Sequence, residues 1–200
     1  MKRISVAAIA LAAMIAAPRA HAQFKVGIAG GASVPTGELA DLTGTGYHGQ
    51  LMLGIAPPLL PVAFRADLSY GRFGVNDEKF VSSCEALGMS CGMSGNVNVM
   101  SATANAIISM PSVGIRPYLI AGGGVYRQQA KGTMTMEGVS QDMDDSETRP
   151  GVTGGVGLSF GMMGKSVFAE ARYVNIFGKK DDTGEKVDTR YVPISIGFMF

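Results

Sequence analysis

Much of the chain alternates between apolar and polar residues, which is the two-residue period of a β-strand. The segment from Tyr191 to Phe200 shows this alternation most clearly. Its apolar face carries Val192, Ile194, Ile196, Phe198 and Phe200. The other face is small or mixed, with Tyr191, Ser195, Gly197 and Met199. A strand of this kind suits a wall with lipid on one side and a packed lumen on the other.

Eight segments have the length that a tilted strand needs to cross a membrane. They lie near residues 24–34, 47–57, 62–73, 97–110, 115–128, 149–161, 166–177 and 190–200. The connections alternate between short ones (57–61, 111–114, 162–165) and long ones (35–46, 74–96, 129–148, 178–189). This asymmetry is typical of barrels with tight periplasmic turns and longer external loops. The pattern predicts an all-β fold, an eight-stranded antiparallel transmembrane β-barrel with up-and-down topology.

Charged residues fall in the middle of two predicted strands, on the face opposite the apolar one. Arg65 and Asp67 lie in the third strand, and Glu170 and Arg172 in the seventh. In a soluble barrel this arrangement would bury charges or expose rows of large apolar side chains, and both are unfavourable. We therefore expect these four residues to form a polar network in the lumen. An eight-stranded barrel is only just filled by side chains, which favours a plug over a gated polar pathway.

The N-terminus has the pattern of a secretory signal peptide. Lys2 and Arg3 precede an apolar run, and Ala20-His21-Ala22 forms a small-x-small cleavage site. We expect residues 1–22 to be cleaved and residues 23–200 to form one barrel domain. Loss of Lys2, Arg3 and Arg19 reduces the 17 basic residues to 14, against 16 acidic residues. This balance gives no electrostatic footprint for a nucleic acid.

The two cysteines, Cys84 and Cys91, lie close together in one polar stretch. In an exported protein this spacing predicts a disulfide in the second long loop. Closing so short a loop stabilises the folded state by roughly 2–3 kcal/mol in the chain-entropy model. The alternative is two free thiols or half of a metal site, but no histidine lies nearby.

Together, the signal peptide, the eight alternating strands, Tyr118 and Tyr126 near the ends of one strand, and the closing strand at Phe200 resemble the small outer membrane β-barrel domain family, the OmpA-like, OmpX-like and opacity-protein-like group. The resemblance implies a monomer in the outer membrane of a Gram-negative bacterium. Outer membrane lipids, lipopolysaccharide and the barrel-assembly machinery are the implied partners. Phe198 and Phe200 resemble the signal that this machinery reads. Trp is absent, so we expect an aromatic girdle near the loop-side rim, built from Tyr47, Tyr70, Phe73, Tyr126, Tyr173 and Phe177.

Motifs for catalysis are weak. His48, the only histidine after the signal peptide, has no recognisable serine partner in sequence, which favours a polar inward or rim residue. The stretch Ser159 to Ser166 resembles a phosphate loop, but its first position is not glycine and no helix follows. The acidic residues at 142, 144, 145 and 147 could bind calcium, yet their spacing favours a solvated loop.

We therefore expect a protein without enzymatic activity, cofactor or metal. Its role is structural or based on surface interaction, with a host or environmental ligand as a candidate at the external loops. Two alternatives remain, a narrow pore or carrier for small or apolar solutes, and a lipid-modifying outer membrane enzyme.

Overall fold

The computed structural model describes residues 23–57, 61–75, 91–136, 139–162, 165–179 and 188–200. Within them lie eight strands and one short helix, which are, in chain order, β1 (Gln23–Thr36), α2 (Glu38–Leu42), β2 (Gly46–Ala56), β3 (Val62–Gly74), β4 (Cys91–Ser109), β5 (Ile115–Met136), β6 (Val139–Met162), β7 (Lys165–Ile176) and β8 (Thr189–Met199). No described helix is long and apolar enough to cross a membrane.

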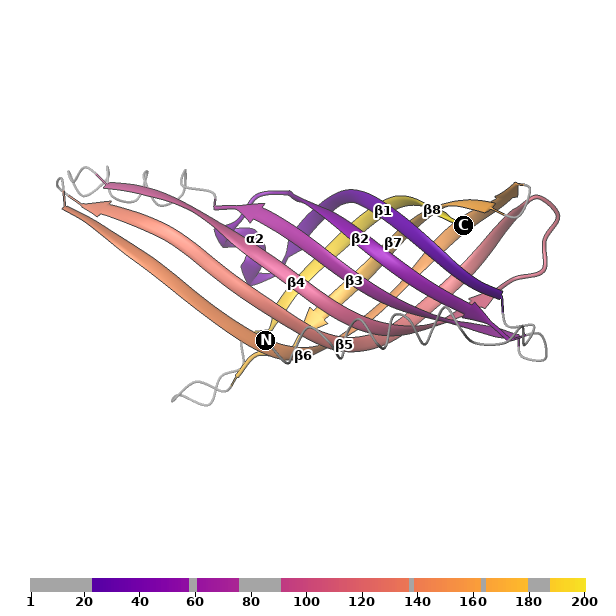
Figure 1. Ribbon diagram of the computed structural model, residues 1–200. Helices are drawn as coiled ribbons and strands as arrows, with labels where there is room; N and C mark the ends of the chain where they lie inside the picture. Colours follow the sequence, from indigo (N-terminus) through magenta and orange to yellow (C-terminus); the bar gives the residue numbers. More distant parts are fainter. Residues whose placement is uncertain (1–22, 58–60, 76–90, 137–138, 163–164, 180–187) are drawn as a thin grey trace, which may run out of the picture.

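The strands form a closed antiparallel barrel in which each strand pairs with its neighbour in sequence and β1 pairs with β8. The closing seam joins Gly27 to Met199 and Thr36 to Arg190. The strands run strongly tilted around the barrel, as Figure 1 shows. The predicted fold and its up-and-down topology are confirmed.

Alternate residues of each strand face outward and inward, as the sequence pattern predicts. On β3, Leu68 is 60% exposed and its neighbour Asp67 only 2% exposed. On β8, Ile196 is 65% exposed and Ser195 only 3% exposed. Large apolar side chains thus cover the outside, whereas all the buried charged side chains of the described residues lie inside, together with polar and some apolar ones. A bilayer supplies the apolar environment that this outer surface requires.

Three strands are much longer than the sequence analysis expects. The predicted loop 129–148 is mostly strand, because β5 and β6 continue as a ladder up to the pair Met136↔Val139. The strand β4 begins at Cys91 rather than near residue 97 and pairs with this extension. Figure 1 shows the ends of β4, β5 and β6 extending beyond the other strands at one end of the barrel.

The first long connection contains an element that the sequence analysis missed. Helix α2 folds against β1 and β8, where half-buried Leu39 packs on buried side chains of the barrel. The Thr43 hydroxyl donates a hydrogen bond to the Leu39 carbonyl at 2.8 Å. The helix has five residues, too few for a hydrophobic period to stand out in the sequence.

Two expectations concern residues outside the described part of the chain. The signal peptide, residues 1–22, lies there, and so does Cys84 of the expected disulfide. Both expectations stay predictions.

Candidate functional site

The inward-facing residues of β7 show how the lumen is layered. From the short-turn end they are Ser166, Phe168, Glu170, Arg172, Val174 and Ile176. Polar and aromatic residues come first, two charges follow in the middle, and two apolar residues finish the series. The seven other strands add side chains to the same layers, so the interior divides into a charged centre and an apolar outer layer.

The charged centre consists of Arg65, Asp67, Glu170 and Arg172, which we call the charged cluster. All four are buried. Arg65 bridges the two acids, with Nε 2.9 Å from Asp67 Oδ1 and Nη2 2.9 Å from Glu170 Oε2. Arg172 does the same, with Nη2 2.8 Å from Asp67 Oδ2 and Nε in contact with Glu170 Oε1. The four side chains thus form a ring of alternating charge that joins β3 to β7 across the lumen.

Further residues complete this ring. Tyr118 on β5 donates a hydrogen bond to Glu170 Oε2 at 2.7 Å, and Asn105 on β4 donates one to Asp67 Oδ2 at 3.0 Å. The guanidinium of Arg65 also lies 5.6 Å from the centre of the Phe168 ring. Neither contact is predicted from the sequence. The alternation along β5, with exposed Leu119 beside it, was the available signal for an inward Tyr118.

Glycine makes room for Tyr118. The paired residue on β6 is Gly157, and a Cβ atom there would lie 2.2 Å from the Tyr118 ring. The ring therefore lies flat over a strand position that no larger residue can occupy. The same arrangement recurs in the middle of β5, where a Cβ at Gly151 would lie 2.8 Å from the Tyr126 ring.

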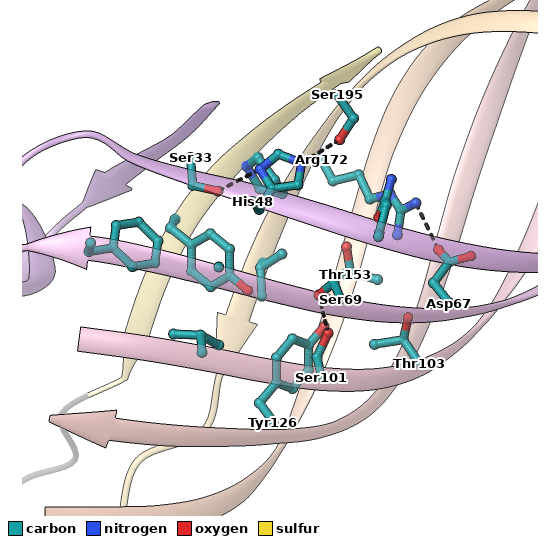
Figure 2. Close-up of a pocket in the computed structure, with 17 residues that line it drawn as sticks. Ser33, His48, Asp67, Ser69, Ser101, Thr103, Tyr126, Thr153, Arg172 and Ser195 are labelled. Carbon is teal, nitrogen blue, oxygen red and sulfur yellow. Dashed lines mark hydrogen bonds and ion pairs between the residues drawn. The ribbon is translucent and has the colours of Figure 1, made fainter. Parts of the chain in front are cut away.

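On the long-connection side of the charged cluster lies a small polar cavity around His48. Its Nδ1 is 2.9 Å from the Ser33 hydroxyl and its Nε2 is 2.8 Å from the Ser195 hydroxyl. Figure 2 shows His48 between these two serines, with Arg172 beside it and bonded to Asp67. The expectation of a polar inward histidine agrees with this position, and the structure adds two serine partners that are not recognisable from the sequence. Ser33 lies on β1, which pairs with β2, and Ser195 lies on β8, one strand further around the barrel. Ser195 is 147 residues from His48 in the chain, so the sequence does not reveal this contact.

The cavity itself has a volume of about 30 Å³. This is room for roughly one or two water molecules. Polar groups of Gln50, Thr103 and Thr153 line it, and Ser69 and Ser101 are hydrogen-bonded to each other at 2.6 Å across its wall.

An outer apolar cluster lies between the cavity and the long-connection end of the lumen. It comprises Phe73, Val99, Tyr126, Val174, Ile176 and Tyr191. The rings of Phe73 and Tyr191 meet edge to face at 5.5 Å. Leu39 of α2 packs on this cluster from outside. The girdle prediction is therefore wrong for Phe73 and Tyr126, which are 0% and 1% exposed and face inward. Tyr47, Tyr70, Tyr173 and Phe177 are exposed.

The predicted acidic loop lies on the extended part of β6. Asp144 pairs with Lys131 of β5 at 3.1 Å, and both side chains are more than half exposed. Hydrogen bonds from Lys131 and Gln129 lower the pKa of Asp144. The described residues contain no group of three or more histidine, cysteine or acidic side chains that could hold a metal ion.

At the junction between β7 and β8, Asp188 accepts a hydrogen bond from the Gly178 amide at 3.0 Å. This bond, and then Asn175 and Arg190, lower the pKa of Asp188. The contact holds together two ends of the long connection.

Family and structural comparisons agree with this architecture. The model of the outer membrane protein beta-barrel domain matches residues 5–200. The chain belongs to this family. It is thus a bacterial outer membrane protein, as its apolar outer surface requires. Comparison with curated proteins found no match.

Two solved structures show the same fold. Neisserial surface protein A has 18% sequence identity and a TM-score of 0.54, covering 89% of this chain and 97% of that one. A major outer membrane protein from Thermus thermophilus has 15% identity and a TM-score of 0.58, covering 89% of this chain and 99% of that one. At these identities the likeness concerns the fold alone.

Proposed function

We propose that this outer membrane barrel protein has a structural and surface-interaction role, with a lumen plugged by its own side chains. The observation that carries the plug is the succession of two closed layers, the charged cluster and the outer apolar cluster. In the family orientation, the short turns face the periplasm and the long connections face outward. The outer apolar cluster then lies at the external end.

The charged cluster supports the plug because its positive and negative charges are equal in number. Two arginines and two acids neutralise each other, and each acid accepts hydrogen bonds from more than one donor. An ion crossing the lumen would have to separate these pairs in a poorly hydrated space. Breaking a buried pair costs roughly 3–5 kcal/mol. The pore alternative would need this cluster to open, and the outer apolar cluster with it.

Planar-bilayer recording tests the plug. The purified wild type should show little or no steady conductance. The double variant Arg65→Ala/Glu170→Ala, which removes one ion pair and leaves the other balanced, should admit small ions more readily. Steady conductance of the wild type, unchanged by this variant, would replace the plug with an open pathway.

The surface role rests on the extended sheet formed by β4, β5 and β6. The pairing of β6 with β7 begins at Gly151↔Ile176, whereas its pairing with β5 continues to Met136↔Val139. The Phe177 amide still donates a hydrogen bond to the Pro150 carbonyl at 3.0 Å. From Val139 to Arg149, β6 lies beyond the ladder of the barrel wall, and no other described strand pairs with this edge. Such an edge offers main-chain donors and acceptors to a partner. Exposed Asp144, Asp145 and Glu147 lie along this edge, where Asp144 pairs with Lys131 and Glu147 pairs with Arg149.

Shortening the hairpin formed by the outer parts of β5 and β6 tests this role. Replacing residues 131–144 by a two-residue turn should leave the barrel assembled, because the deleted ladder lies outside the wall. Cells that display the protein should then lose adhesion to an immobilised panel of host extracellular-matrix proteins and epithelial cells. A matched variant, Lys131→Gln/Asp144→Asn, keeps the hairpin and removes only its ion pair. If shortening leaves every adhesion in the panel unchanged, the hairpin is not the working surface.

We also propose that the protein is not an enzyme. His48 and Ser195 have the spacing of a base and a nucleophile, but both are buried beneath the outer apolar cluster. The adjoining cavity of about 30 Å³ is too small for a lipid substrate. Expression of the protein should therefore leave the mass of lipid A unchanged. A mass change that Ser195→Ala abolishes would establish the enzymatic alternative.

A further inference from the structure

The periplasmic end of the lumen widens into a hollow that the plug does not use. Its volume is about 490 Å³, and all eight strands contribute to its wall. Gly54, Ala63 and Ser159 leave space at the sides, and Arg65 and Tyr118 of the central network form its floor. We call this hollow the inner vestibule. It is more than ten times larger than the cavity around His48.

The charges of the inner vestibule have one sign. Lys25, Arg116 and Lys165 line it, and no acidic side chain is among the described residues of its wall. The floor contributes no net charge, because Arg65 is balanced within the charged cluster. Lys165 lies over the Phe200 ring at 5.4 Å, whereas Lys25 and Arg116 form none of the ion pairs found in the described part of the chain. A hollow lined by one sign of charge concentrates counter-ions.

The direction of these basic side chains shows whether they can bind a ligand in the lumen or instead anchor the barrel to lipid headgroups. Basic residues that anchor a barrel to lipid headgroups belong on the outer face. Lys25 instead alternates with Phe24 and Val26, which are 56% and 58% exposed on that face. Arg116 follows exposed Ile115 in the same way and precedes inward-facing Tyr118 by two positions. Both cations therefore point into the mouth of the barrel, not toward the bilayer.

The deeper wall is apolar. Ile107, Phe168 and Met199 line it. Phe168 belongs to a buried cluster with Met52 and Tyr118, and Ile107 and Met199 pack against that cluster. We propose that the inner vestibule binds a small organic anion from the periplasmic side, a phosphate or carboxylate attached to a short apolar body. Lys25 and Arg116 hold the anionic group, and the apolar body lies against Phe168 and Met199. The same chemistry can come from a soluble metabolite or from the headgroup region of an anionic phospholipid.

Methionine-methyl NMR on the full barrel in zwitterionic nanodiscs tests this site, with hexyl phosphate as the probe. The Met199 methyl group should shift and saturate, while that of Met100, exposed on the outer face, should not. Inorganic phosphate and hexanol each carry half of the recognised chemistry, so both should bind at least tenfold more weakly. Equal binding of inorganic phosphate, or no saturable shift at Met199, would overturn the proposal.

The double variant Lys25→Gln/Arg116→Gln should weaken hexyl phosphate binding at least tenfold. Its matched control, Arg72→Gln/Arg127→Gln, removes two exposed charges near the other end of the barrel and should bind like the wild type. Heat-modified gel mobility establishes that both variants are folded. If both double variants weaken hexyl phosphate binding equally, the effect comes from the overall charge of the protein, and the proposed site is wrong.

A third measurement distinguishes the two sources of the ligand. In nanodiscs that contain phosphatidylglycerol, loss of the hexyl phosphate response would show that the lipid's own phosphate occupies the vestibule. A retained response would identify a soluble periplasmic anion as the ligand. If the response is unchanged in these nanodiscs and the Lys25→Gln/Arg116→Gln variant binds hexyl phosphate like the wild type, the vestibule binds neither a lipid phosphate nor a soluble anion.

Discussion

The sequence predicts which residues face the lumen, but it does not predict which of them contact each other. Strand alternation alone places Arg65, Asp67, Glu170 and Arg172 on the inner face. It does not say which side chains meet across the barrel, because this depends on stagger and tilt. The contacts of Tyr118 with Glu170, and of His48 with Ser33 and Ser195, follow from that geometry. They join residues up to 147 positions apart in the chain.

The charged cluster gives a test at this scale. Glu170→Ala would leave both arginines short of a partner and should lower the free energy of unfolding by roughly 3–5 kcal/mol if the site is dry. Glu170→Ala/Arg65→Ala removes a matched pair and leaves Asp67 with Arg172, so its loss should be smaller. Urea unfolding in detergent measures both, with exposed Glu38→Ala as a control close to zero. A double variant less stable than Glu170→Ala would contradict the charge-balance argument.

Asp188 supplies a pH dependence outside the membrane. Its pKa is lowered, chiefly by the hydrogen bond from the Gly178 amide. A carboxylate with a lowered folded-state pKa stabilises the fold above its unfolded pKa, and this contribution is lost as the pH falls through the folded-state value. The amide shift of Gly178 should therefore titrate below the usual aspartate range. In Asp188→Asn this titration should disappear; its persistence would assign it to another group.

Strands inside the membrane were predictable because lipid requires one apolar face. Beyond the membrane that requirement ends, and this explains the error at residues 129–148. There β5 and β6 carry Gln, Thr, Asp and Ser, with polar residues on both faces. Such residues look like a loop, although the backbone still forms a ladder up to Met136↔Val139. Helix α2 was missed for a related reason, since its stability comes from Leu39 packing on the barrel.

The final strand provides a test at the scale of elements. The Phe200 amide donates a hydrogen bond to the Val26 carbonyl at 2.8 Å, so Phe200 extends the seam between β8 and β1. Its ring belongs to the exposed apolar row with Ile196 and Phe198. Phe200→Ala should therefore reduce the fraction of assembled barrel several-fold in outer-membrane fractions, with signal-peptide cleavage unchanged. Exposed Phe24→Ala is the matched control, and equal assembly of Phe200→Ala and wild type would remove the assembly role.

The whole molecule is a closed ring of strands. Closure could be predicted because an open sheet would leave the backbone groups of its edge strands unpaired in lipid. What the sequence does not contain is the division of the interior into layers. That division arises only when eight strands, each carrying a few polar or apolar residues, are brought to a common height. The inner vestibule is the clearest case, because no two of its basic residues lie on the same strand.

Closure also predicts behaviour on gels. A closed hydrogen-bonded barrel resists sodium dodecyl sulfate until it is heated, because no strand edge of the wall is open to competition. Unboiled and boiled samples of detergent-solubilised protein should therefore migrate differently. Recovery of the protein in the soluble periplasm with a single mobility would contradict insertion as a closed barrel.

The seam between β1 and β8 sets an order of events in time. Gly27 finds its partner Met199 only after nearly the whole chain has been delivered, so no partial chain can complete the ring. Contacts between residues this far apart in sequence form slowly, since the intervening chain must first be ordered. Until then the two edge strands and the apolar outer rows remain open to water and to other chains. The interval between export and closure is thus the period in which the chain is most exposed to aggregation.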